Sequence, residues 1–152
     1  MNWNAKDIEM YLKEKQYIDT AVVPLLPVDF DDGMKRAAAQ GEFITLLTSH
    51  LEHQFKGRIL LYPPFTYLKE NSGSSDAERL LNWTNRIKEN ETKYVFYLTS
   101  DSDWKKQGDT IEDSLIWIPS IPLENLDEQY KHSIMEDQVK QLLNVIVQKW
   151  QM

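Results

Sequence analysis

The sequence contains no cysteine, and it has only five glycines among 152 residues. Without cysteine the chain forms no disulfide and offers no thiolate nucleophile, no iron–sulfur ligand and no cysteine-rich zinc site. Phosphate-binding loops depend on glycines that let backbone amides approach the anion. The chain carries neither a GxGxxG nor a Walker pattern. These absences argue against thiol chemistry and against nucleotide binding.

Basic residues and long apolar runs are also scarce. The 17 Lys and Arg are outnumbered by 24 Asp and Glu, and the formal net charge of −7 disfavours binding to nucleic acid or to a membrane surface. No apolar run approaches the ~20 residues of a membrane-spanning helix, and no signal peptide pattern is visible. We therefore expect a cytoplasmic protein with neither a nucleic-acid nor a membrane partner.

Apolar residues nevertheless make up 41% of the chain, which is enough to build the core of a single α/β domain spanning residues 1–152. Helical and strand-like patterns alternate along it. The predicted helices run from a cap at Asn4 to near Tyr17, between Gly33 and Gly57, from a cap at Ser75 or Asp76 through Ile87, and from about Asp127 to Trp150. The predicted strands run from Ala21 to near Pro24, from Arg58 to Tyr62, from Lys93 to Thr99 and from Leu115 to Ile118.

This order, α-β-α-β-α-β-β-α, predicts a three-layer α/β/α sandwich with a four-stranded, mostly parallel sheet. The first strand should end near Pro24, because proline cannot donate to a ladder. The unbroken apolar runs Ile59–Leu61 and Tyr94–Leu98 indicate that those two strands lie at the centre of the sheet. The link to the last strand is near the minimum length for a parallel crossover, so an antiparallel last strand is the alternative.

Acidic residues follow two of these strands. Asp29, Asp31 and Asp32 come after the first strand, and Asp101 and Asp103 come after the third. Ligands of open parallel sheets bind at the carboxyl ends of the strands, and converging carboxylates could hold Mg²⁺. The alternative is that each aspartate serves its own turn or helix cap.

Other catalytic patterns are weak. His50 and His53 lie three residues apart on a predicted helix, and His132 is the only other histidine. A catalytic zinc needs a third protein ligand and an open position, so a solvent-facing pair is the simpler interpretation. No Gly-x-Ser-x-Gly elbow is present. We predict no cofactor, and the sequence favours a protein that is not an enzyme.

Aromatic residues suggest a binding surface instead. Tyr62, Phe65 and Tyr67 flank two prolines at the end of the second strand, and Trp104 lies in a charged loop. Exposed aromatics of this kind suit protein recognition, although Phe65 and Tyr67 could equally fold down as a lid on the core. The leading hypothesis is a non-catalytic binding or regulatory protein that acts on a protein partner. The alternative is a Mg²⁺-dependent phosphoryl-transfer or hydrolytic enzyme that uses the acidic turns.

The last predicted helix has an apolar stripe longer than the sheet beneath it. A 24-residue helix is ~36 Å long, whereas four strands span only ~15 Å. The surplus end, with Ile146 and Trp150, could form a homodimer contact. The alternative, which we favour, is that the first helix covers this surplus through Ile8, Tyr11 and Leu12.

The N-terminal block supplies one resemblance. The segments Trp3–Ile8, Tyr11–Leu12, Tyr17–Ala21 and Pro24–Leu25 resemble the YpiF-like family of small cytosolic Bacillus-type proteins of unknown function. The resemblance implies a bacterial, cytosolic origin over the whole chain. It implies no activity, cofactor or site residue.

Overall fold

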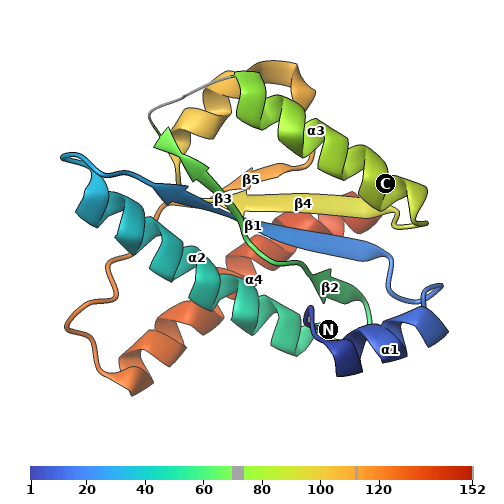
Figure 1. Ribbon diagram of the computed structural model, residues 1–152. Coiled ribbons are helices and arrows are strands. Elements are labelled where there is room, and N and C mark those ends of the chain that lie inside the picture. The colour runs from blue at the N-terminus through green and yellow to red at the C-terminus, as the bar shows by residue number, and fades with distance from the viewer. Residues whose placement is uncertain (70–73, 112, 152) are drawn as a thin grey trace.

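The computed structural model describes residues 1–69, 74–111 and 113–151, and in this part of the chain a parallel sheet lies between two layers of helices (Figure 1). The α/β sandwich predicted from the sequence is therefore confirmed. The elements in chain order are α1 (Ala5–Lys13), β1 (Thr20–Val28), α2 (Met34–Gln54), β2 (Ile59–Leu61), β3 (Phe65–Leu68), α3 (Ser74–Glu89), β4 (Tyr94–Thr99), the 3₁₀ helix η2 (Ser102–Thr110), β5 (Leu115–Trp117) and α4 (Glu128–Trp150).

The sheet has the strand order β2-β1-β4-β5, and β3 pairs with β1 beyond the end of β2. It therefore has five strands rather than the predicted four. β2 and β3 are successive pieces of one edge strand, interrupted at Pro63 and Pro64. β5 pairs in parallel with β4 through Leu98 and Ile116, so the antiparallel alternative for the last strand is wrong.

The central strands are β1 and β4, and the prediction that Ile59–Leu61 lies at the centre is wrong. β2 lies at the edge, next to β1 and an isolated bridge from Asn2 to Leu61. Both of its faces are nevertheless covered, because Ile59 belongs to the core under α2 and α4 while Leu60 packs against α1. An unbroken apolar run indicates that both faces of a strand are covered. It does not indicate whether the strand has one neighbour in the sheet or two.

β1 continues to Val28, past the predicted end at Pro24, and its register shows how it accommodates proline. The carbonyl of Val22 accepts a hydrogen bond from the Tyr62 amide at 2.9 Å, so alternate residues of β1, including Pro24, direct their backbone polar groups toward β2 and β3. Pro24 lies in the gap between the β2 and β3 pairings. Pro27 faces the other side, beyond the end of the β4 pairing. Each missing amide hydrogen therefore falls where no strand is available to accept it.

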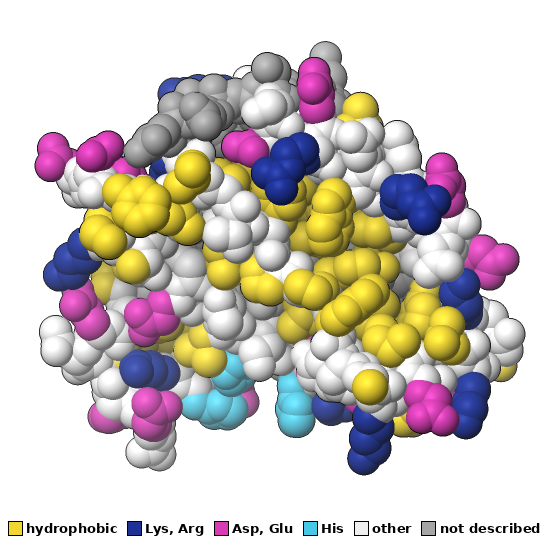
Figure 2. Space-filling view, in the orientation of Figure 1, with side chains coloured by type: hydrophobic (Ala, Val, Ile, Leu, Met, Phe, Trp, Pro, Cys, Tyr) yellow, Lys and Arg dark blue, Asp and Glu magenta, His cyan; other side chains and the backbone are white. Residues whose placement is uncertain are grey.

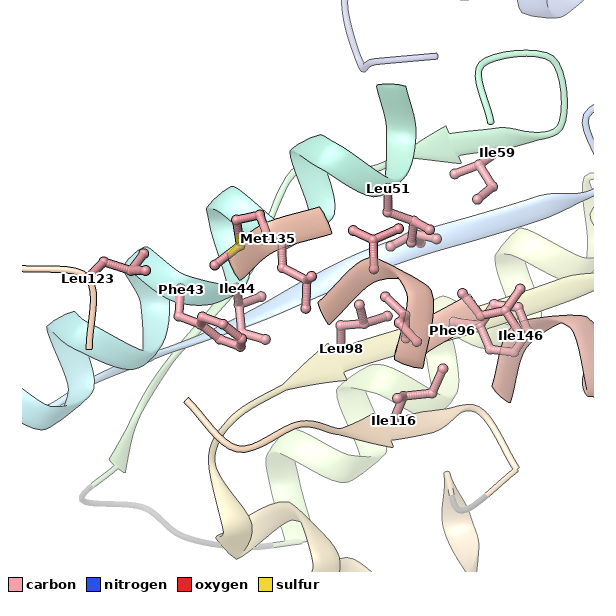
Figure 3. Close-up of a cluster of buried hydrophobic side chains, with 14 residues drawn as sticks. Phe43, Ile44, Leu51, Ile59, Phe96, Leu98, Ile116, Leu123, Met135 and Ile146 are labelled. Atoms are coloured by element: carbon pink, nitrogen blue, oxygen red, sulfur yellow. The ribbon is translucent and has the colours of Figure 1, made fainter. Parts of the chain in front are cut away.

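α2 and α4 cover one face of the sheet, where their side chains meet those of the strands in the largest buried cluster (Figure 3). α3 and η2 cover the other face, over a second cluster centred on Val23, Tyr97 and Leu80. α1 packs against Leu60, whose register partner Ala21 belongs to that second cluster, so α1 shares the face of α3. Among the described residues, no helix combines the length and the apolar character needed to cross a membrane.

The predicted helix boundaries hold best for α4, which begins after Asp127 and ends at Trp150. α1 ends at Lys13, before the predicted end near Tyr17. Because α1 and α4 lie on opposite faces, the expectation that the first helix covers the surplus of the last one is wrong, and Leu12 is 63% exposed. Ile146 is fully buried within the chain's own core instead.

Candidate functional site

A groove of about 460 Å³ lies between the C-terminal half of α3 and the end of β2, on the face of the sheet that also carries α1. Figure 2 shows hydrophobic side chains exposed in a broad band across the face on which β2, β3 and α3 lie in Figure 1. The groove is lined by Tyr62, Asn82, Trp83, Arg86, Ile87, Glu89 and Asn90.

Two segments that are distant in sequence supply its aromatic surface. Tyr62 lies between the end of β2 and Pro63, and its ring centroid is 5.0 Å from that of the exposed Trp3. Burial raises the pKa of Tyr62 to about 12. Its hydroxyl, which like any tyrosine hydroxyl is protonated at neutral pH, can donate to a ligand. Trp83 on α3 is 36% exposed. Tyr62 and Trp83 line the same groove, so with Trp3 they form an aromatic strip.

The polar rim ties α1 to α3. The side-chain oxygen of Asn90 accepts a hydrogen bond from Lys15 Nζ at 2.8 Å, and its amide nitrogen donates to the Tyr11 hydroxyl at 3.3 Å. Arg86 donates to the Glu89 carboxylate at 2.9 Å, and both side chains are mostly exposed. The groove therefore combines an apolar surface with exposed amide and guanidinium donors.

The structure separates the four aromatic residues predicted to form a binding rim. Only Tyr62 lines the groove, whereas Phe65, Tyr67 and Trp104 are 3%, 7% and 4% exposed. Phe65 and Tyr67 alternate with exposed residues along β3 and so point into the core. Trp104 packs edge-on against Tyr67 with ring centroids 5.1 Å apart. The prediction that Phe65, Tyr67 and Trp104 are exposed is therefore wrong. Phe65 and Tyr67 fold onto the core, as the alternative interpretation expected.

Trp3 and Trp83 were missed as surface aromatics. Trp83 lies three residues after Leu80 and one before Thr84, both of which face the core, so helical spacing places it at the border of the buried face. This border position is the sequence signal that could have identified Trp83 as a surface aromatic. Trp3 precedes α1 and belongs to no periodic element, so no pattern marked it.

A buried polar network occupies the carboxyl end of β4. Asp101, 2% exposed, accepts hydrogen bonds from the Tyr67 hydroxyl at 2.7 Å, from Lys69 Nζ at 2.8 Å and from the Asp103 amide at 3.0 Å. Burial, followed by the hydrogen bond to Asp101, raises the pKa of Tyr67 above its usual range. The hydrogen bond from Lys69 lowers the pKa of Asp103. These contacts anchor the start of η2 on β3 and β4, which is a structural role.

In the acidic turn after β1, an aspartate side chain binds a backbone amide of the same turn. One carboxylate oxygen of Asp29 accepts a hydrogen bond from the Asp31 amide at 2.9 Å, next to the start of α2, and Asp32 is exposed. Within residues 1–69, 74–111 and 113–151, no three His, Asp or Glu side chains are arranged to hold a metal ion. The described structure therefore does not bring Asp29, Asp31 and Asp32 together with Asp101 and Asp103 into one group of potential metal ligands, and the Mg²⁺-enzyme alternative gains no support from the geometry.

Two comparisons with known proteins identify relatives of the chain. A family model described as "Protein of unknown function (DUF2487)" matches residues 9–150. The "Uncharacterized protein YpiF" of Bacillus subtilis (strain 168) is 39% identical over 158 aligned positions, which cover 99% of this chain and 98% of that protein. The chain belongs to this family.

Membership in the YpiF-like family confirms the resemblance inferred from the N-terminal block, and it supports a bacterial origin. No solved structure matches the chain. The names of these relatives assign no ligand or reaction.

Proposed function

We propose that the protein is a non-catalytic binding or regulatory protein that acts on a protein partner through the groove between α3 and Tyr62. The observation that carries this proposal is the aromatic strip formed by the exposed rings of Trp3 and Trp83 and the half-buried ring of Tyr62. Tryptophan and tyrosine are enriched at protein interfaces, because they bury a large area with few rotatable bonds and keep one polar atom for a hydrogen bond. The proposal includes the cytosolic setting predicted from the sequence.

The remaining groove residues support binding rather than chemistry. Among the lining residues that the structure describes, Glu89 is the only carboxylate, and it is paired with Arg86. The described part of the lining includes no histidine, serine or threonine, so these residues place no hydroxyl nucleophile next to a histidine base. Asn82 and Arg86 are exposed donors beside an apolar floor, which is the arrangement of an interface core with its polar rim.

Quantitative affinity capture from a lysate of the source bacterium tests the proposal with three baits. These are the wild type, an Asn82→Arg variant that fills the groove from an exposed position, and a Tyr130→Ala control. Tyr130 is 59% exposed on α4, on the opposite face of the sheet. We expect at least one protein to be captured by the wild type and the control and to be lost with Asn82→Arg.

Direct titration of that protein, once purified, against Trp83→Ala should show an affinity about 30-fold weaker than for the wild type, which is the loss typical of a central aromatic contact. Because Trp83 packs edge-on against Phe65, thermal unfolding of the variant must first show that it is folded. A set of captured proteins that is identical for all three baits would refute the groove as the binding site.

A further inference from the structure

All three histidines of the chain line one cavity of about 440 Å³ between α2 and α4, on the face of the sheet opposite the groove. His50 and His53 come from the C-terminal half of α2, and His132 comes from the second turn of α4. The histidine side chains in Figure 2 accordingly gather at one border of the molecule. Segments about 80 residues apart thus bring together every side chain of the chain whose ordinary pKa lies near neutrality.

One pair of histidine rings spans the two helices. The rings of His50 and His132 have centroids 5.4 Å apart and an interplanar angle of 50°. His132 Nε2 lies 3.0 Å from a carboxylate oxygen of Glu136, one turn along α4. His53 is exposed one turn from His50 on α2.

The other charged groups at this cavity already have partners. The carboxylate of Glu52 is 2.9 Å from the amine of Met1 and 3.7 Å from Lys56 Nζ. Glu136 is therefore the carboxylate that faces the imidazole pair. When both His50 and His132 are protonated, two positive charges lie close together and only the Glu136 carboxylate opposes them.

The electrostatics of His50 agree with this geometry. Burial, followed by the nearby His132, lowers the pKa of His50; Glu136 opposes the shift and His53 adds to it. At His50 the folded chain therefore binds a proton less readily than the unfolded chain, in which a histidine titrates near 6.5. A depressed histidine pKa contributes stability that is present above this value and lost as the pH falls below it.

The cavity borders a contact on which the core depends. Phe43 and Leu47 of α2 belong to the same buried cluster as Met135 and Val139 of α4. His132 precedes Met135 by one helical turn, so a force that separates His50 from His132 acts on the helix segment that carries these core side chains.

We propose that the three-histidine cavity is an acid-sensitive latch, in which weakly acidic pH loosens the first half of α4 from α2 while β1, β4 and α3 keep their packing. The latch is independent of the groove, which lies across the sheet. Acidification would thus change one layer of the fold and leave the binding face assembled.

Hydrogen exchange of the full chain at about pH 7.5 and about pH 5.5, on either side of the histidine titration range, tests the latch. After correction for the intrinsic pH dependence of exchange, we expect residues 128–139 to exchange several-fold faster at the lower pH and residues 94–99 to show no change. His50→Gln and His132→Gln should abolish the difference. His53→Gln, which leaves the His50–His132 ring pair in place, should keep most of it.

Two further results separate the latch from general acid destabilisation. Glu136→Gln should enlarge the acid effect, because it removes the carboxylate that favours protonation of His50. A titration of the wild type followed by NMR should place His50 below its ordinary pKa, and His132→Gln should raise it. Equal acid sensitivity in the wild type and in His50→Gln, or no acceleration of residues 128–139 in the wild type, would overturn the proposal.

Discussion

The guanidinium carbon of Arg58 lies 3.7 Å from the centre of the Trp150 ring. Arg58 Nε also donates to an Asp19 carboxylate oxygen at 3.0 Å, and Trp150 Nε1 donates to the Thr20 hydroxyl at 2.8 Å. The last turn of α4 is therefore held by the residues that begin β1 and precede β2. These contacts occupy a side chain that the sequence suggested for self-association.

Loss of the Trp150 ring should destabilise the chain without changing its association. We expect Trp150→Ala to lower the free energy of unfolding by about 2–3 kcal/mol, because it removes a partly buried ring, a cation–π contact and a hydrogen bond. Urea denaturation measures the loss, and sedimentation velocity should give the same oligomeric state for both proteins. Val147→Ala, at a position 38% exposed on the same helix, should stay within about 0.5 kcal/mol of the wild type. A change of oligomeric state in Trp150→Ala alone would instead support the homodimer contact.

Removal of the Tyr67 hydroxyl should show the strength of the buried carboxylate network. We expect Tyr67→Phe to cost about 1.5–3 kcal/mol of unfolding free energy, because the hydroxyl donates to the buried carboxyl group of Asp101, which also accepts from Lys69 Nζ. Tyr94→Phe is the matched control, since it loses a partly buried bond to the Trp150 carbonyl at 3.1 Å and should cost about 1 kcal/mol. Equal losses in the two variants, measured by urea denaturation, would contradict a special contribution from the network.

Alkaline pH should weaken the core through Tyr97. Burial raises the pKa of this phenol to about 12, and its oxygen lies 2.7 Å from the Thr84 hydroxyl. A raised pKa means that the folded chain holds the proton more tightly, so the stability is complete below about pH 10 and is lost as the pH rises through about 12. In a pH series of denaturation curves, Tyr97→Phe should be the less stable protein at neutral pH and should lose less stability on alkalinisation. An exposed control, Tyr130→Phe, should follow the wild-type profile.

The register of β1 predicts which of its positions accept proline. Pro24→Ala should change the free energy of unfolding by less than about 1 kcal/mol, because Pro24 lies in the gap between two pairings and only the entropy of the unfolded chain changes. Val22→Pro places proline where β1 pairs with Leu61 and should cost on the order of 3 kcal/mol or unfold the chain. Circular dichroism and urea denaturation compare the two, and similar losses would contradict the register explanation.

The features that the sequence determined by itself are those that depend on near neighbours. The side chain of Asn4 was predicted to cap the first helix, and it accepts a hydrogen bond from the Asp7 amide at 2.8 Å. The last helix was predicted from about Asp127 to Trp150, and Asp127 caps it by accepting from the Tyr130 amide at 2.7 Å. Caps and helical periodicity act within one or two turns, so these boundaries can be read without knowledge of the fold. The alternation of helices and strands likewise predicted the parallel α/β sandwich.

The order of the strands and the exposure of the aromatics were decided by the tertiary structure. An apolar run such as Ile59–Leu61 looks the same at the edge and at the centre of a sheet when helices cover both faces. Tyr62 and Tyr67 flank the same pair of prolines, yet one lines a groove and the other reaches a buried carboxylate. Trp83 and Tyr62 line the same groove only because α3 returns over the sheet. Packing between distant segments sets these relationships, and the energies that fix strand register and side-chain burial are shared by residues far apart in the chain.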